Sequence, residues 1–139
     1  MLSQADKETI VEAIAKAECL TSGEIRVHID KKCPGDPLER AIQLFGELKM
    51  HETAQRNGVL IYLSFSDKKV AIVGDEGINE RVPVNFWDSS RSIMTYHFKN
   101  NDFARGIILA IKEAGEQLKR YFPIQEGDKN ELSNEITLG

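Results

Sequence analysis

Residues 57–74, NGVLIYLSFSDKKVAIVG, decide the fold of this chain. Residues 59–63 form a continuous apolar run, which is typical of a central strand covered on both faces. A short polar turn at residues 66–69 follows, and residues 70–73 predict a returning strand. Because this turn is too short for a crossover connection, the two strands must pair antiparallel.

The segment before this hairpin predicts a parallel strand. Residues 24–29 alternate between polar and apolar side chains, as a strand with one apolar face does. A helix should follow up to about residue 50, because Asp36 can serve as its N-cap and Pro37 suits its first position. A strand, a helix and a strand in this order favour two parallel strands joined by a right-handed crossover. The predicted sheet is therefore small and mixed.

Other segments predict helices on both faces of this sheet, so the fold class is α/β. They show helical spacing or a helical turn and are residues 3–18, 78–82, 86–98 and 102–122. Ser3 and Asp6 can form a capping box at the first of them, and Asp102 can cap the last. We expect one domain over residues 1–123 and a flexible tail over residues 124–139, which are polar and aperiodic.

Composition excludes several classes of protein. The chain has 139 residues, a formal net charge of −4 and no basic stripe, so we expect no nucleic-acid partner. No apolar run approaches the roughly 20 residues that cross a bilayer, and the N-terminus does not resemble a signal peptide. We therefore expect a cytoplasmic protein without a membrane partner. Cys19 and Cys33 flank the first strand, too far apart for a disulfide, and should be free thiols.

The strand directions predict a cluster of oxygen ligands at one edge of the sheet. Glu24 begins the first strand, Asn57 precedes the second, and Asp75 and Glu76 follow the third, which runs the opposite way. Carboxylates that gather in this way either raise a pKa or attract a cation. Ca²⁺ and Mg²⁺ prefer such oxygen ligands. The predicted ligands are Asp75, Glu76 and Asp102, with Glu24, Asn57 and Glu80 as further or supporting ligands.

Each of these residues also has a simpler interpretation. Asp75 and Glu76 can be solvated turn residues, Asp102 can be a helix cap, and Glu24 can be an exposed residue at the start of a strand. The acids do not have the spacing of an EF-hand loop. The cysteines and histidines do not have the spacing of a zinc site.

Several segments together resemble the TPM domain family. They are residues 21–27 (TSGEIRV), 56–62 (RNGVLIY), 70–78 (VAIVGDEGI) and 98–107 (FKNNDFARGI). The resemblance covers the chain to about residue 123 and is strongest to the short bacterial members. It implies a three-layer α/β/α sandwich around a small mixed sheet and the binding of a divalent cation by acidic residues near the sheet edge. It also implies phosphatase activity in some plastid relatives and accessory roles in membrane-anchored ones.

Two main functional hypotheses follow. The first is a Ca²⁺- or Mg²⁺-binding module that acts as an accessory or interaction domain, with another protein as a candidate partner. The alternative is a metal-assisted phosphatase that acts on phosphomonoesters. In that case Glu24 would be a general base, and the candidates for holding phosphate are Arg26, Arg56 and Arg105. A third hypothesis is a scaffold whose tail recruits a partner.

Overall fold

A computed structural model gives the fold of the chain and describes residues 2–124 and 136–139. The elements along the chain are α1 (Gln4–Glu18), β1 (Glu24–Asp30), α2 (Pro37–Glu47), β2 (Gly58–Ser64), β3 (Val70–Gly74), α3 (Glu76–Asn79), α4 (Asp88–Lys99), α5 (Phe103–Tyr121) and β4 (Thr137–Leu138). The predicted strands and helices are therefore present. The longest element is α5, which follows α4 on one face of the sheet.

The sheet is mixed and has the strand order β3-β2-β1-β4. β1 pairs in parallel with β2, with Glu24 beside Gly58. β2 pairs antiparallel with β3, with Val59 beside Gly74. This arrangement confirms the predicted crossover and hairpin, and it places the start of β1, the start of β2 and the end of β3 at one edge of the sheet.

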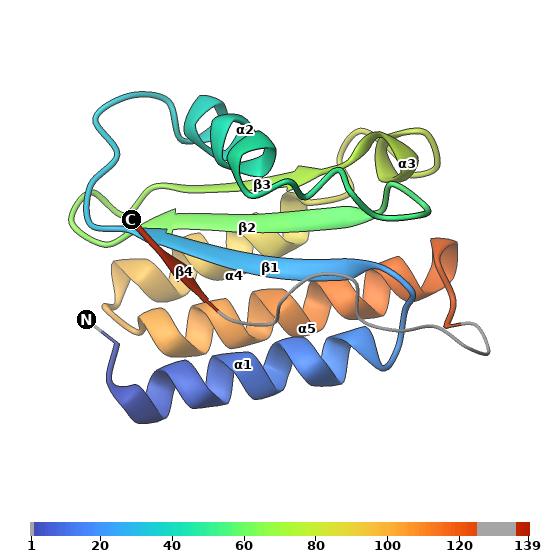
Figure 1. The fold of residues 1–139 in the computed structure, drawn as a ribbon. Helices are drawn as coiled ribbons and strands as arrows, with labels where there is room; N and C mark the ends of the chain where they lie inside the picture. Colours follow the sequence, from blue (N-terminus) through green and yellow to red (C-terminus); the bar gives the residue numbers. More distant parts are fainter. Residues whose placement is uncertain (1, 125–135) are drawn as a thin grey trace.

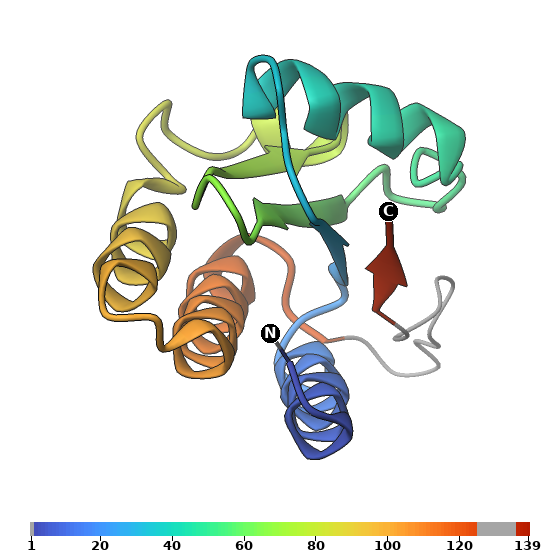
Figure 2. The same cartoon turned by 90° about the vertical axis from the view of Figure 1, so that its left-hand side faces the viewer.

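Helices cover both faces of the sheet and form a three-layer α/β/α sandwich. α2 lies on one face, whereas α1, α4 and α5 lie on the other (Figures 1 and 2). β2 is buried at every position, as expected for a strand covered on both sides. In the neighbouring strand β1, polar and apolar side chains alternate, and the apolar ones face α1 and α5.

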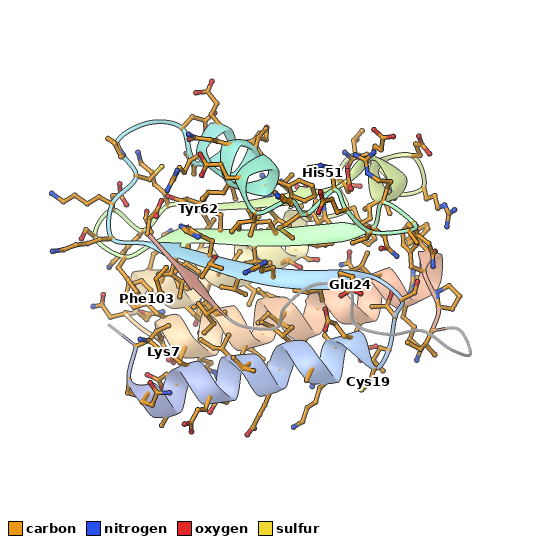
Figure 3. All side chains as sticks on the ribbon, viewed as in Figure 1. Lys7, Cys19, Glu24, His51, Tyr62 and Phe103 are labelled. Carbon is orange, nitrogen blue, oxygen red and sulfur yellow. The ribbon has the colours of Figure 1, made fainter. Side chains whose placement is uncertain are left out.

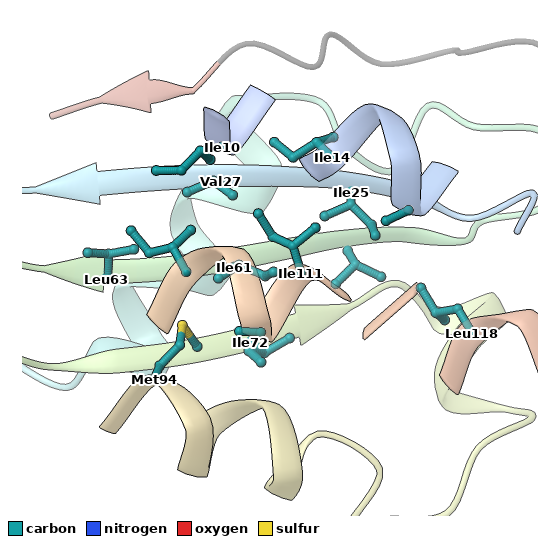
Figure 4. Packing of buried hydrophobic residues seen from close by; sticks show 14 of the residues in the cluster. Ile10, Ile14, Ile25, Val27, Ile61, Leu63, Ile72, Met94, Ile111 and Leu118 are labelled. Atoms are coloured by element: carbon teal, nitrogen blue, oxygen red, sulfur yellow. The ribbon is translucent and has the colours of Figure 1, made fainter. Parts of the chain in front are cut away.

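Two apolar cores hold the layers together. The larger one joins the sheet to α1, α4 and α5 (Figure 4), and includes Ile14, Val27, Ile61 and Ile111, all with 0% exposure. The smaller one lies under α2 and includes Phe45 of that helix. Full burial of one such side chain contributes roughly 1.5–3 kcal/mol, so these cores fix the relative positions of the layers.

Local sequence signals set most of the helix ends. Ser3 and Asp6 form the predicted capping box, in which the Asp6 amide donates to Ser3 Oγ at 3.0 Å. Asp36 caps α2, and Pro37 is its first residue. Asp102 precedes α5, but its side chain makes no capping hydrogen bond, contrary to our expectation.

The C-terminal residues differ from the prediction of a flexible tail. Thr137–Leu138 forms β4, which pairs in parallel with β1, and the Gly139 amide donates to Ile29 O at 2.9 Å. Thr137 also forms hydrogen bonds with His28 and with Val27 O, so side chains fix this short strand. The rest of the predicted tail, residues 125–135, lies outside the described residues.

Candidate functional site

The predicted edge of the sheet brings together three of the predicted ligands. The Glu24 amide donates to Asn57 O at 3.2 Å, and the Asp75 amide donates to Gly58 O at 2.9 Å. All three residues are buried: Glu24 is 3% exposed, Asn57 1% and Asp75 6%. The spatial prediction from strand directions is therefore confirmed for Glu24, Asn57 and Asp75.

Asp75 has an arginine as its partner. Arg56 Nε and Nη2 donate to the two carboxylate oxygens of Asp75, each at 2.8 Å. The same carboxylate accepts from the Glu76 amide at 2.8 Å and so caps α3. This bidentate pair neutralises Asp75 and occupies most of its lone pairs, and it places a positive charge where a cation would have to bind.

Asn57 connects two loops at this edge. Its Nδ2 donates to Ser22 O at 3.2 Å, and its backbone amide donates to Thr53 Oγ1 at 3.2 Å. The Asn57 side chain therefore ties the segment before β1 to the segment before β2. This connection holds in place the loop that leads into Glu24.

The other three predicted ligands are exposed, and one lies far away. Glu76 and Glu80 belong to α3 and its C-cap at the same edge, and Arg56 Nη1 lies 3.6 Å from Glu76 Oε1. Asp102 lies at the opposite end of the sheet, because α4 carries the chain back by about 18 Å. Its neighbour Phe103 packs against Phe65, which follows β2, at a ring distance of 4.8 Å. Asp102 therefore cannot close a site with Asp75, and Figure 3 shows Glu24 and Phe103 at opposite ends.

An acid that the sequence analysis missed lies beside Glu24. Glu18, the last residue of α1, accepts a hydrogen bond from the Ile25 amide at 2.9 Å. Its carboxyl group is also hydrogen-bonded to the carboxyl group of Glu24. Burial and the nearby Glu24 charge raise the pKa of Glu18 to about 8, against the lowering effect of the Ile25 hydrogen bond. We call Glu18 and Glu24 the acidic pair; at neutral pH it holds a proton.

A second polar cluster lies further along β1. Asp30 accepts from Tyr62 Oη at 2.6 Å, from Arg40 Nε at 2.9 Å and from His28 Nε2 at 2.8 Å. The other ring nitrogen of His28 lies 2.8 Å from Thr137 Oγ1. The sequence signal for this cluster is a polar residue at every second position of β1, on the face opposite the apolar one.

The electrostatics of this second cluster indicate a structural role. Burial alone would raise the pKa of Asp30, but hydrogen bonds from Arg40, Tyr62 and His28 lower it to about 2. Burial and the bond to Asp30 raise the pKa of Tyr62. Both His28 nitrogens have partners, so the ring holds β4 in place.

Few of the described side chains are therefore placed to bind a divalent cation. Within residues 2–124 and 136–139, no group of three or more His, Cys, Asp or Glu side chains is arranged to hold a metal ion. The acidic pair offers two carboxyl groups, which fits the hydrated mode in which one or two carboxylates bind Mg²⁺.

Cys19 is exposed, Cys33 is buried, and both are free. In the part of the chain that is described, no helix combines the length and apolar character needed to cross a membrane.

Comparisons with known proteins give a consistent assignment. A family model described as the TPM domain matches residues 1–117. The NMR structure of BA42 protein from the psychrophilic bacterium Bizionia argentinensis is 43% identical, covers 100% of this chain and 96% of that chain, and has a TM-score of 0.94. The solution NMR structure of the N-terminal domain of a P. gingivalis protein is 17% identical, covers 87% of this chain and 78% of that chain, and shares the fold with a TM-score of 0.69. No curated protein matches the chain.

Proposed function

The chain belongs to the TPM domain family, and from this premise we propose that it is a binding module whose acidic pair takes up Ca²⁺ or Mg²⁺ in exchange for a proton. The observation that supports this proposal is the contact between the Glu18 and Glu24 carboxyl groups, of which Glu18 has a pKa raised to about 8. Two carboxyl groups in contact, one buried and one half-buried, do not both ionise readily without a compensating positive charge. A proton and a cation are the alternatives for supplying it.

Mg²⁺ is a suitable ion for such a pair, because it does not need a fully enclosed site. It binds through one or two carboxylates and keeps several water molecules, and Glu18 is only half-buried, so water can reach the pair. Ca²⁺ would need more protein oxygens, and therefore weaker binding is expected for it. Asn57 would support the site through its hydrogen bond to Ser22.

This proposal changes the ligands that the sequence suggested. Glu24 stays a ligand, and Glu18 replaces Asp75, whose carboxylate already has Arg56 and the α3 amide as partners. Glu76 and Glu80 lie at the same edge but are exposed. They would contribute to cation binding only through the attraction of their negative charges.

A metal-assisted phosphatase has less support from the geometry. It would need a cationic side chain to hold phosphate beside the metal. Arg56 is held by Asp75, and Arg105 belongs to the first turns of α5, at the end of the sheet far from Glu24. Arg26 is in β1 two residues after Glu24, but it is half-buried and its Nε is enclosed. We therefore propose the binding of a divalent cation, rather than phosphatase activity, as the function.

The experiment is a titration of ¹⁵N-labelled protein with MgCl₂ and, separately, with CaCl₂. The Ile25 amide is the reporter, because it donates directly to Glu18. We expect it to shift on addition of millimolar Mg²⁺, and Glu18→Gln to abolish that shift. Glu80→Gln is the matched control, since it removes one exposed acid at the same edge and should leave the shift unchanged.

Proton release gives the experiment a second readout. Calorimetry in two buffers of different ionisation enthalpy should show that one cation displaces a proton, and the affinity should rise with pH up to about 8. Shifts that centre on Glu76 and survive Glu18→Gln would show that the cation binds elsewhere. Absence of any shift at millimolar ion would remove the proposal.

A further inference from the structure

We propose that the outer edge of β1 is a docking site for an extended segment of another protein, in which a threonine is followed by an aromatic residue and a glycine. The chain's own residues 136–139 occupy this edge in the structure and would compete with that partner. β4 is the outermost strand on this side of the sheet (Figures 1 and 2). Among the described residues it pairs with His28 and Ile29 of the seven-residue β1. Addition of a segment to a sheet edge is a common mode of peptide recognition.

The first recognition element of this edge binds a hydroxyl group. Thr137 lies beside His28 in the ladder, and its Oγ1 is 2.8 Å from His28 Nδ1. The same hydroxyl group donates to Val27 O at 3.3 Å. His28 is 3% exposed, and its other ring nitrogen lies 2.8 Å from Asp30 Oδ1. Because a buried polar group without a partner costs free energy, an apolar side chain in place of the threonine would be disfavoured.

The second recognition element requires glycine two residues after the threonine. A Cβ at Gly139 would overlap Asp30 Oδ1 and would lie 2.8 Å from His28 Nε2. The Asp30 carboxylate is held in place, because Arg40 Nε and Tyr62 Oη also donate to it, at 2.9 Å and 2.6 Å. The buried cluster therefore rejects segments that lack the hydroxyl group or carry a side chain at the glycine position. Rejection of the wrong segment is what gives a docking site its specificity.

The third recognition element is a groove that the chain's own segment does not fill. Alternate side chains of a strand face opposite sides, so residues 136 and 138 face α1 whereas Thr137 faces His28. Ile136 packs against the larger core. Beside it lies an open groove of about 510 Å³, whose lining includes Lys7 and Val11 of α1. Leu138 also lines this groove but remains 60% exposed.

The unfilled groove favours a foreign segment over a second copy of this chain. An aromatic ring at the position of Leu138 would cover Val11 and lie beside Lys7, whose ammonium group is attracted to the face of a ring. Such a partner would bury more apolar surface than β4 does. Residues 136–139 of a second copy would only repeat the contacts of β4, and would therefore gain nothing by replacing it.

The docking site is separate from the acidic pair. The Ile25 amide, near the start of β1, donates to Glu18 at 2.9 Å, so that end of the edge already has a partner. β4 begins to pair three residues later, at His28. Loss of cation binding would therefore leave the docking proposal intact, and the reverse also holds.

The test measures binding of free peptides to the full chain with Thr137→Pro and Gly139→Ala. These two changes prevent the chain's own segment from docking, since proline cannot donate to a ladder and alanine does not fit beside Asp30. The probe is the nonapeptide of residues 131–139, and amide shifts of His28 and Ile29 in ¹⁵N-labelled protein report its binding. The wild-type chain is the control and should bind each peptide at least about tenfold more weakly, because its tethered segment competes.

Three changes in the peptide test the three recognition elements without altering the protein. We expect Leu138→Phe to strengthen binding about threefold or more, because the ring fills the groove. Thr137→Val should weaken binding about fivefold through the lost hydroxyl group. Gly139→Ala should abolish it.

Several outcomes would overturn the proposal. Equal affinities of the original peptide and its Leu138→Phe form would show that the groove does not select a partner. Binding that survives both Thr137→Val and Gly139→Ala would show that the cluster does not discriminate, and self-association of the wild-type chain through residues 136–139 would make a second copy the occupant. Leu138→Phe in the otherwise wild-type chain gives an independent check. The Gly139 amide, which donates to Ile29 O, should then exchange more slowly, and unchanged exchange would contradict a role for the groove.

Discussion

Replacing Glu18 by Gln should remove most of the pH dependence of folding stability between about pH 5 and 8. The pKa of Glu18 is raised from 4.5 to about 8 in the folded protein, first by burial and then by Glu24. The folded state therefore binds more protons than the unfolded state in this window. Since stability falls with pH wherever the folded state holds the extra proton, the free energy of unfolding should decrease from pH 5 to 8 and level off above.

The magnitude follows from the size of this difference. One pKa unit corresponds to about 1.4 kcal/mol, so the full difference for a fully buried group would be about 5 kcal/mol. Glu18 is half-buried, and solvent screening reduces its contribution to about 2 kcal/mol. Gln keeps the acceptor for the Ile25 amide and gains a donor for Glu24. We therefore expect Glu18→Gln to match wild type at about pH 5 and to be about 2 kcal/mol more stable at about pH 9.

Urea denaturation followed by circular dichroism at several pH values measures this directly. Glu12→Gln, which changes an exposed acid of the same helix, is the control and should follow the wild-type curve. Millimolar Mg²⁺ should flatten the wild-type curve and leave the Glu18→Gln curve unchanged, since the cation replaces the proton. If the free energy of unfolding varied with pH in the same way for wild type and Glu18→Gln, the acidic pair would not hold a proton. The cation proposal, which depends on that proton, would then also be refuted.

Three further predictions concern other parts of the fold. Gly77→Ala should lower stability by about 2 kcal/mol or more, because a Cβ there would lie 2.6 Å from one backbone carbonyl and closer to another; thermal unfolding measures it. Asp75→Ala should cost about 2 kcal/mol through loss of the α3 cap and the arginine pair, and Asp75→Asn, which keeps the cap, should cost less in the same urea assay. Thr137→Val should cost about 1 kcal/mol of β4 docking through the lost His28 bond; faster exchange of the Gly139 amide, with unchanged global stability, would show it.

The sequence predicted the fold because its signals were local and mutually consistent. The apolar run of β2 and its short turn required a hairpin, and the segment with Asp36 and Pro37 required a crossover helix. Strand directions then brought Glu24 and Asp75 to one edge without any knowledge of packing. β4 was missed because two residues carry too little periodicity, and what holds Thr137 is His28, a residue 109 positions away.

The gathering of Glu24, Asn57 and Asp75 at one edge of the sheet was predicted, but the partners of these side chains were not. Which side chain neutralises Asp75 depends on how the loop before β2 turns Arg56 towards it. Asp102 was placed wrongly because a twelve-residue α4 reverses the chain and moves the next turn to the far end of the sheet. Glu18 carries no such signal, because it is the last residue of a helix, whereas Glu24, Asn57 and Asp75 lie at the ends of strands.

The order of elements, their caps and the edge where the acids gather are determined by residues close together in the chain, whose preferences act over one or two turns. The partners of buried charges were decided by tertiary structure alone. A buried carboxyl group must find a proton, a cation or a guanidinium within hydrogen-bond distance, and packing of distant segments sets which of these is near. For that reason Asp75 has Arg56, whereas Glu18 and Glu24 have each other.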